Sequence, residues 1–219
     1  MRAAGLGLGL ALVLGVLASP ALAQTKVPLT REQVLSEIKG QDVELRRRAA
    51  AWLGELGTMS DAPVLLQALG DDDEVVRLLA ENSVWQVWSR SGDPDADSLL
   101  QVGIEQMNSG DGPAAVETFS KVIQKKPDFA EAWNKRATVY FLMGEDQKSL
   151  KDCDEVIKRN PAHFGALAGY GQIYLHLNQP EQALVYFRRA LRINPNMTGV
   201  RRVIPELEEL LSERRKGSI

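Results

Sequence analysis

The chain has 219 residues, a formal net charge of −3, 25% charged residues and 6% aromatic residues. These values are typical of an ordinary globular protein and exclude a disordered or a basic chain. Proteins that bind nucleic acid need a basic face to neutralise phosphates, and no face of the predicted helices is clearly basic. We therefore expect no nucleic acid among its partners.

Residues 1–23 have the pattern of an export signal. Arg2 is followed by an apolar run over 6–18, by Pro20 and by the small-x-small triplet at 21–23. A membrane anchor is the alternative, but the run is only about 13 residues, against about 20 needed to span a bilayer as a helix. The sequence therefore predicts a cleaved signal.

Cleavage would leave a mature chain that begins at Gln24, in the bacterial periplasm or outside the cell, with membrane contact only through the transient signal peptide. Residues 24–29 form a polar lead-in that we expect to be mobile. The single cysteine, Cys153, cannot form an internal disulfide. We expect it to be buried and inert rather than reactive.

A weak repeat of constant spacing runs through residues 30–91. Its matching positions are Asp42, Arg46, Ala49, Leu53 and Leu56, which recur as Asp73, Arg77, Ala80, Val84 and Val87. The pattern resembles HEAT repeats. The resemblance implies that Asp42, Arg46, Asp73 and Arg77 bridge adjacent units.

Four helices are predicted in this segment, near 30–39, 42–56, 61–69 and 73–89, divided by glycine turn signals. Trp52, Trp85 and Trp88 fall on their apolar stripes. We expect these rings to pack between helices, and a ligand platform is the alternative.

Residues 89–95, which contain Gly92 and Pro94, are the candidate boundary between two segments. Such a short linker permits either a hinge or a continuous stack of helix pairs. We expect the stack, because the apolar faces on both sides need neighbours.

Residues 96–195 contain a stronger repeat that runs without insertion. It is marked by Pro127, Pro161 and Pro195, by Leu99, Trp133 and Leu167, by Ala115, Ser149 and Ala183, and by the aromatics Tyr140 and Tyr174. This pattern, with its period of about 34 residues, resembles three tandem tetratricopeptide repeats, at 96–129, 130–163 and 164–197. The resemblance implies an all-α fold, a right-handed α-α superhelix (solenoid) of antiparallel helix pairs.

Within each unit, Gly110, Gly144 and Asn178 occupy one turn position, where a left-handed residue is often needed. Gly103, Ala137 and Gly171 let paired helices approach closely, and Phe119, Cys153 and Phe187 fill the space between units.

Residues 198–216 are predicted to form a capping helix, which a solenoid needs to cover its last apolar face. Its expected apolar stripe is Val203, Leu207, Leu210 and Leu211, and Pro205 either begins or kinks the helix.

The first helices of tetratricopeptide units usually line a concave groove that receives a peptide or partner helix. Carried onto this sequence, the groove residues are Leu100, Ile104, Met107, Asn134, Thr138, Phe141, Ala168, Gln172 and Leu175. Most are apolar or neutral, which favours an apolar extended segment or an amphipathic helix as ligand. The carboxylate-clamp subfamily is poorly matched, because Leu100, Ile104, Gly165 and Gly169 stand where its polar residues should be. Some groove residues could instead contact the HEAT-like segment or the cap.

Nothing in the sequence indicates an active site. His163 and His176 lack a second ligand at metal spacing, no glycine-rich phosphate loop is present, and no nucleophile has a base in sequence context. Both histidines are expected at the surface. We therefore expect a non-enzyme without cofactor or metal.

Two functions remain. The first is a periplasmic interaction scaffold or adaptor that binds another protein or peptide, one of the cell envelope. The alternative is a self-associating structural subunit of an envelope assembly.

Overall fold

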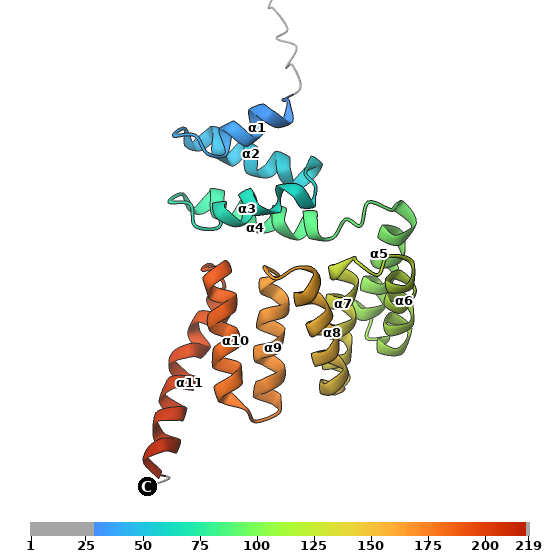
Figure 1. Ribbon diagram of the computed structural model, residues 1–219, viewed down its shortest axis with the longest axis vertical. Coiled ribbons are helices and arrows are strands. Elements are labelled where there is room, and N and C mark those ends of the chain that lie inside the picture. Colours follow the sequence, from blue (N-terminus) through green and yellow to red (C-terminus); the bar gives the residue numbers. More distant parts are fainter. Residues whose placement is uncertain (1–28, 218–219) are drawn as a thin grey trace, which may run out of the picture.

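The computed structural model describes residues 29–217, so the predicted signal peptide and nearly all of the lead-in lie outside the described residues. Within that range every regular element is helical (Figure 1). The elements are α1 (Arg31–Glu37), α2 (Val43–Leu56), the 3-10 turn η1 (Met59–Asp61), α3 (Ala62–Ala68), α4 (Glu74–Trp88), α5 (Pro94–Asn108), α6 (Gly112–Lys125), α7 (Ala130–Leu142), α8 (Asp146–Arg159), α9 (Phe164–His176), α10 (Pro180–Ile193) and α11 (Thr198–Gly217). We call α1–α4 the N-terminal segment and α5–α10 the array. Across residues 29–217, no helix combines the length and the apolarity needed to cross a bilayer.

The array consists of three helix pairs whose turns share one conformation. Gly110, Gly144 and Asn178 have φ of 82°, 76° and 55°. After each, a backbone N–H bonds to the carbonyl five positions earlier, as Asp111 does with Gln106 at 2.9 Å. This is the Schellman ending, in which a left-handed residue closes the helix. The predicted turn position is confirmed.

Two glycines allow close contact within helix pairs. A Cβ at Gly103 would lie 2.5 Å from the ring of Phe119, and a Cβ at Gly171 would lie 2.4 Å from the ring of Phe187. Close approach at these glycines was predicted. The phenylalanines were expected between units, and they also pack inside their own pair.

The N-terminal segment holds its two repeats together with paired side chains. Arg46 bonds to both carboxylate oxygens of Asp71, and Arg47 bonds to both oxygens of Asp73. Asp42 instead caps α2 by accepting from two backbone N–H groups. Asp–Arg bridges therefore join the two units, but Arg46 takes Asp71 as its partner and Asp73 bonds to Arg47 instead. Arg77, which was also predicted to bridge units, bonds within residues 29–217 only to carbonyls of the turn before α4.

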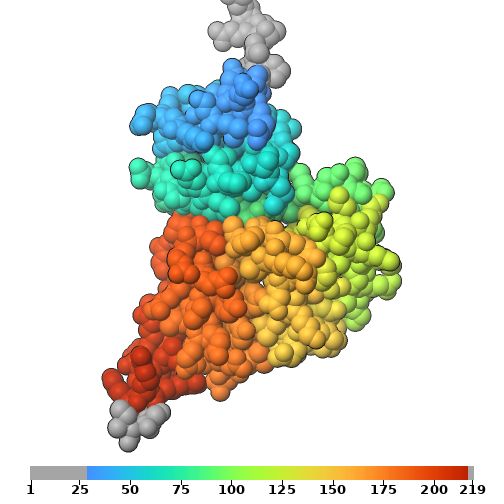
Figure 2. Space-filling model, in the orientation of Figure 1, coloured from blue at the N-terminus to red at the C-terminus, as the bar shows by residue number. Residues whose placement is uncertain are grey.

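The N-terminal segment lies across the ends of the array helices, which differs from the continuous stack that we expected (Figure 1). The ring of Trp88 stacks on His163 with centroids 4.4 Å apart, and Trp85 meets Phe164 edge-on at 5.0 Å. Asn196, beyond α10, donates to the carbonyl of Leu69 at 2.8 Å. Figure 2 shows α3 and α4 seated directly on the ends of α9 and α10.

This packing explains why the surface position expected for His163 is wrong. The side chain is fully buried beneath α4, and its Nδ1 accepts the N–H of Ala166 to cap α9. His176 is exposed as expected and bonds to Asp146 at 2.7 Å. Trp85 and Trp88 pack between helices, as the sequence predicted.

Helix α11 covers the last face of the array. Leu207 is buried against Leu184 and Phe187, with Val203 and Leu211 packed around it. Leu210 was expected in this stripe but is 38% exposed. Ile204 takes its place, because residues three apart on a helix share a face and 204 is in register with 207. Pro205 lies inside the helix.

Candidate protein-binding groove

A cavity of about 250 Å³ opens between α7 and α9, the first helices of the second and third units. Five of its lining residues were predicted from the sequence: Asn134, Thr138, Phe141, Ala168 and Gln172. Ser149 and Cys153 of α8 also line it, with Met197 beyond α10. The five predicted residues, which belong to two helices that are distant in the sequence, therefore line one cavity.

A second cavity, of about 580 Å³, shares Gln172 and Met197 with the first. It contains the predicted residue Leu175, the apolar side chains Phe187, Val200 and Val203, and the charged side chains Glu81 and Arg202. Glu81 comes from α4 and Arg202 from α11. We call the two cavities together the groove.

The three predicted residues of the first unit lie elsewhere. Leu100 is fully buried in a cluster with Phe119 and Phe129, and Ile104 and Met107 pack against the same cluster. Large apolar side chains at these positions of α5 fold into the core of the first unit. At the positions of Leu100 and Ile104, α7 and α9 carry smaller or polar residues. A ligand cannot reach Leu100.

Two glycines of α9 shape the groove in different ways. A Cβ at Gly165 would lie 2.4 Å from the ring of Trp85, so this glycine admits α4. A Cβ at Gly169 would meet only Cys153 Sγ, at an ordinary 3.9 Å. Gly169 therefore leaves space that the fold does not need, and this space belongs to the cavity.

The polar groups of the first cavity are largely bonded within the protein. Thr138 Oγ1 donates to the carbonyl of Asn134, and Ser149 Oγ donates to the carbonyl of Ala137. Asn134 Nδ2 donates to Glu131. The exposed amide of Gln172 remains at the rim. Such a lining offers apolar contact and few charges to a ligand.

Beneath the groove, a buried hydrogen bond joins α7 to the start of α9. Because His163 Nδ1 accepts the N–H of Ala166, Nε2 is the nitrogen that donates, to Glu131 Oε2 at 3.0 Å. Burial alone raises the pKa of Glu131, but the hydrogen bond from His163 and the charge of Lys135 outweigh burial and lower it. The carboxylate is therefore ionised and positions both helices.

Cys153 lies at the floor of the groove. Burial raises the pKa of its thiol to about 12, and the charges of Asp152 and Asp154 act in the same direction. A thiol with so high a pKa carries almost no thiolate at neutral pH, which agrees with the inert role expected from the sequence.

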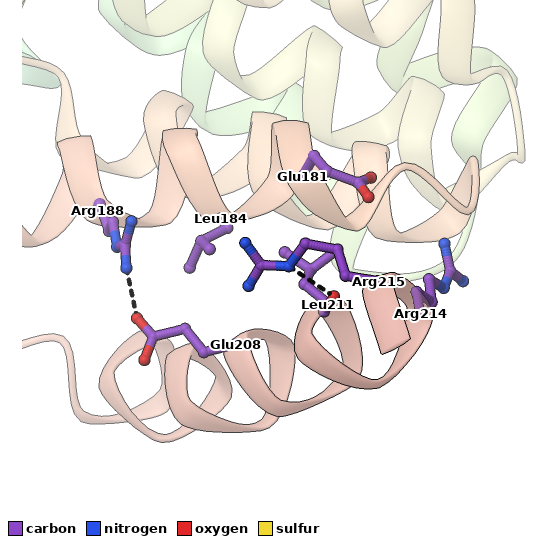
Figure 3. Close-up of a pocket in the computed structure, with 7 residues that line it drawn as sticks. All are labelled: Glu181, Leu184, Arg188, Glu208, Leu211, Arg214 and Arg215. Atoms are coloured by element: carbon purple, nitrogen blue, oxygen red, sulfur yellow. Dashed lines mark hydrogen bonds and ion pairs between the residues drawn. The ribbon is translucent and has the colours of Figure 1, made fainter. Parts of the chain in front are cut away.

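A third cavity, of about 670 Å³, lies outside the groove, between α10 and the C-terminal half of α11 (Figure 3). Its guanidinium groups are already bonded: Arg188 to Glu208, Arg214 to Asn178 and Arg215 to the carbonyl of Leu211. We therefore regard it as a charged wedge between two helices and not as the site.

Sequence reasoning missed Glu81, Met197 and Arg202. Glu81 reaches the groove only because the N-terminal segment folds back over the array, which no local pattern records. The glycines were visible in the sequence, but only as departures from the carboxylate clamp.

Comparison with known proteins agrees with this geometry. Family models described as tetratricopeptide repeat match residues 130–163 and 167–197. A tetratricopeptide repeat-containing protein of Rhizobium etli is 33% identical over 137 residues, covering 63% of this chain and 65% of that protein. Hsp70-Hsp90 organizing protein 1 of Glycine max is 25% identical over 118 residues, covering 52% of this chain and 21% of that protein. The chain thus spans less than two thirds of these relatives.

Among solved structures, the first tetratricopeptide domain of Spaghetti (RPAP3), bound to the HSP90 peptide SRMEEVD, has a TM-score of 0.52 and 20% identity. The match covers 53% of this chain and 93% of that domain. This likeness shows a shared fold. From its repeat period, its helix pairs and its two family matches, the chain is a tetratricopeptide repeat protein.

Proposed function

We propose that the protein is a non-catalytic scaffold or adaptor that binds an apolar peptide segment or an amphipathic helix of another protein. The groove between α7 and α9 is the binding surface. The observation that carries the proposal is the first cavity, which has uncharged walls and, beside Gly169, space that the fold itself does not fill. An apolar side chain entering it would gain burial without leaving a charge unpaired.

The relatives support an interaction role. One bears the name of an Hsp70-Hsp90 organizing protein, and one solved neighbour is titled as bound to an HSP90 peptide. Tetratricopeptide proteins of this kind are generally interaction modules and not enzymes. The clamp positions here hold Leu100, Ile104, Gly165 and Gly169, so we propose that this groove selects apolar contact.

We further propose that the protein works in the periplasm or outside the cell and that its partner belongs to the cell envelope. The support is the signal-like pattern of residues 1–23. The intact mass of the exported protein tests this proposal. We expect the mass of a chain that begins at Gln24. The mass of the uncleaved chain would contradict the proposed location.

Gly169→Leu tests the groove, with Gly169→Ala as its control. The leucine fills the first cavity, whereas the alanine adds a single methyl group at an ordinary contact distance. We expect the wild type and Gly169→Ala to capture the same envelope protein, identified by cross-linking mass spectrometry, and Gly169→Leu to lose it. Full capture by folded Gly169→Leu would exclude this groove.

Light scattering on the same variants addresses the alternative of self-association. A monomer that captures a foreign protein supports the adaptor. A defined homo-oligomer that Gly169→Leu dissociates would assign the groove to a second copy of the chain.

A further inference from the structure

The N-terminal segment contains two copies of one arginine arrangement, and only the first copy has all its partners. Arg46 Nη1 donates to two carbonyls of the preceding turn, at 3.2 and 2.9 Å. Its Nε and Nη2 form a fork that bonds to the two carboxylate oxygens of Asp71, at 2.8 and 3.0 Å. Arg77, the counterpart of Arg46 in the second repeat, makes the first contact again, since its Nη1 donates to the carbonyls of Asp71 and Asp72 at 2.8 and 3.0 Å.

The fork of Arg77 has no such carboxylate. Among residues 29–217, no acidic side chain bonds to its Nε or Nη2, and the position that would match Asp71 in a further repeat holds Val102 in α5. The repeat ends there. The guanidinium of Arg77 is therefore held by two carbonyls through Nη1, while its Nε and Nη2 remain available to a carboxylate.

The face of α4 around Arg77 is the one on which a third repeat would pack. In α2, the equivalent face contacts the second repeat: the carbonyl of Ala50 accepts from Ser83, and the carbonyl of Gly57 accepts from Arg90. The positions of the second repeat that correspond to Ala50 and Gly57 are Glu81 and Trp88.

The array covers only part of this face. Trp88 stacks on His163, so α9 takes the place of a third repeat at the C-terminal half of α4. Glu81 lines the second cavity of the groove, and Arg77 lies one helical turn before it on the same face. The neighbouring Leu78 is 58% exposed. The N-terminal half of α4 thus stands open beside the groove.

We propose that the open fork of Arg77 binds a carboxylate of the partner segment that lies in the groove, an inference that rests on the proposed function. The partner is a segment of another protein that carries an aspartate or glutamate about one turn beyond its apolar anchors. Charge complementarity favours this occupant, because a second cation, Arg202, lines the second cavity together with Glu81. Glu81 repels an acidic residue that lies one turn further along α4. The attraction of Arg77 and the repulsion of Glu81 together fix where the partner segment carries its acidic residue.

The chemistry of the fork makes the recognition specific. Arginine presents two parallel N–H donors that match both oxygens of a carboxylate, whereas lysine presents a single point charge. The first copy of the arrangement, between Arg46 and Asp71, shows the geometry within this chain.

Random peptides displayed on phage, selected on the purified full-length protein, test the proposal. We expect enrichment of Asp or Glu at one fixed spacing from a pair of apolar residues. For a selected peptide, changing its acidic residue to the amide or making Arg77→Gln should each weaken binding about tenfold, with little further loss together. Arg77→Lys should restore only part of the affinity.

Arg77 also holds the turn before α4, so folding needs its own control. Arg77→Glu, combined with a peptide whose acidic residue is changed to lysine, should regain affinity, which a merely structural role would not produce. Thermal melts followed by circular dichroism check that each variant is folded.

The outcomes separate this inference from the proposed function. If the selected peptides show no acidic preference but still require Gly169, the Arg77 inference is overturned and the proposed function of the groove stands. Acid-dependent peptides that bind Gly169→Leu equally well would support the Arg77 site and contradict the groove. No enrichment at all would contradict both. An oligomer that Arg77→Gln dissociates would make the occupant a second copy and overturn the proposal as stated.

Discussion

Three glycines of α9 show how one residue type serves different ends within a single helix. Gly171 lies against the ring of Phe187, Gly165 against the ring of Trp85, and Gly169 against open space. Gly171 lets α9 and α10 pack closely, and Gly165 lets α4 pack against α9. Gly169 leaves space in the first cavity. Their neighbours in space, and not their place in the helix, decide what each glycine does.

Alanine at these positions should therefore have opposite effects on stability. Gly169→Ala should raise the free energy of unfolding by up to about 1 kcal/mol, because alanine is the better helix former. Gly171→Ala should lower it by about 1–3 kcal/mol, because the methyl group meets a buried ring. Urea titrations followed by circular dichroism measure both. Equal effects at the two positions would contradict the packing described.

Cys153 gives a second prediction at this scale. With its pKa raised from 9.0 to about 12, the native thiol should carry roughly a thousandfold less thiolate than in the unfolded chain. Alkylation followed by mass spectrometry should therefore be slow in the native protein and fast in urea. Similar rates in both states would show that the thiol is accessible.

At the scale of elements, the contact between α4 and the start of α9 combines rings with a buried charge. Trp88 covers His163, and His163 bonds to Glu131 on α7. Helix boundaries were predictable from the sequence, because turns, caps and periodicity are local. The contact between α4 and His163 could not be predicted. The local sequence of His163 is that of a surface residue, and it is buried only because α4, which is distant in the sequence, packs over it.

The lowered pKa of Glu131 predicts how stability changes with acid. Because its pKa is lower in the folded state than its ordinary value of 4.5, this carboxylate stabilises the fold above about pH 4.5 and loses that contribution as the pH falls through the folded pKa. Glu131→Gln should therefore flatten the acid side of the stability profile. An unchanged acid slope in the variant would contradict the buried pair.

The whole molecule is a tetratricopeptide array with a helical segment seated on its ends (Figures 1 and 2). The tetratricopeptide pattern predicted the array, and six of the groove residues named from it, all in α7 and α9, line the two cavities. The weaker repeat predicted the helices of the N-terminal segment. The lining of the second cavity could not be predicted, because Glu81 and Arg202 come from segments that are distant in the sequence.

Removal of the Trp88 ring, which packs the N-terminal segment against the array, should weaken the contact between these two parts. Trp88→Ala should cost about 3–5 kcal/mol, as for other buried aromatic residues, and should separate unfolding of the two parts into two steps. Trp133→Ala is the matched control, since that ring lies on the array under Arg136 and Arg159. Two-step unfolding in Trp133→Ala but not in Trp88→Ala would contradict the claim that Trp88 joins the N-terminal segment to the array.

The central claim, that the groove binds a partner segment, is tested most directly by a photoreactive residue at position 172 in the native cell. Gln172 lines both cavities, and Val185, 56% exposed on α10 and not among the groove residues, is the control. We predict a cross-link to one partner protein from position 172 and none to it from position 185. A partner captured from position 185 and not from 172 would contradict the account.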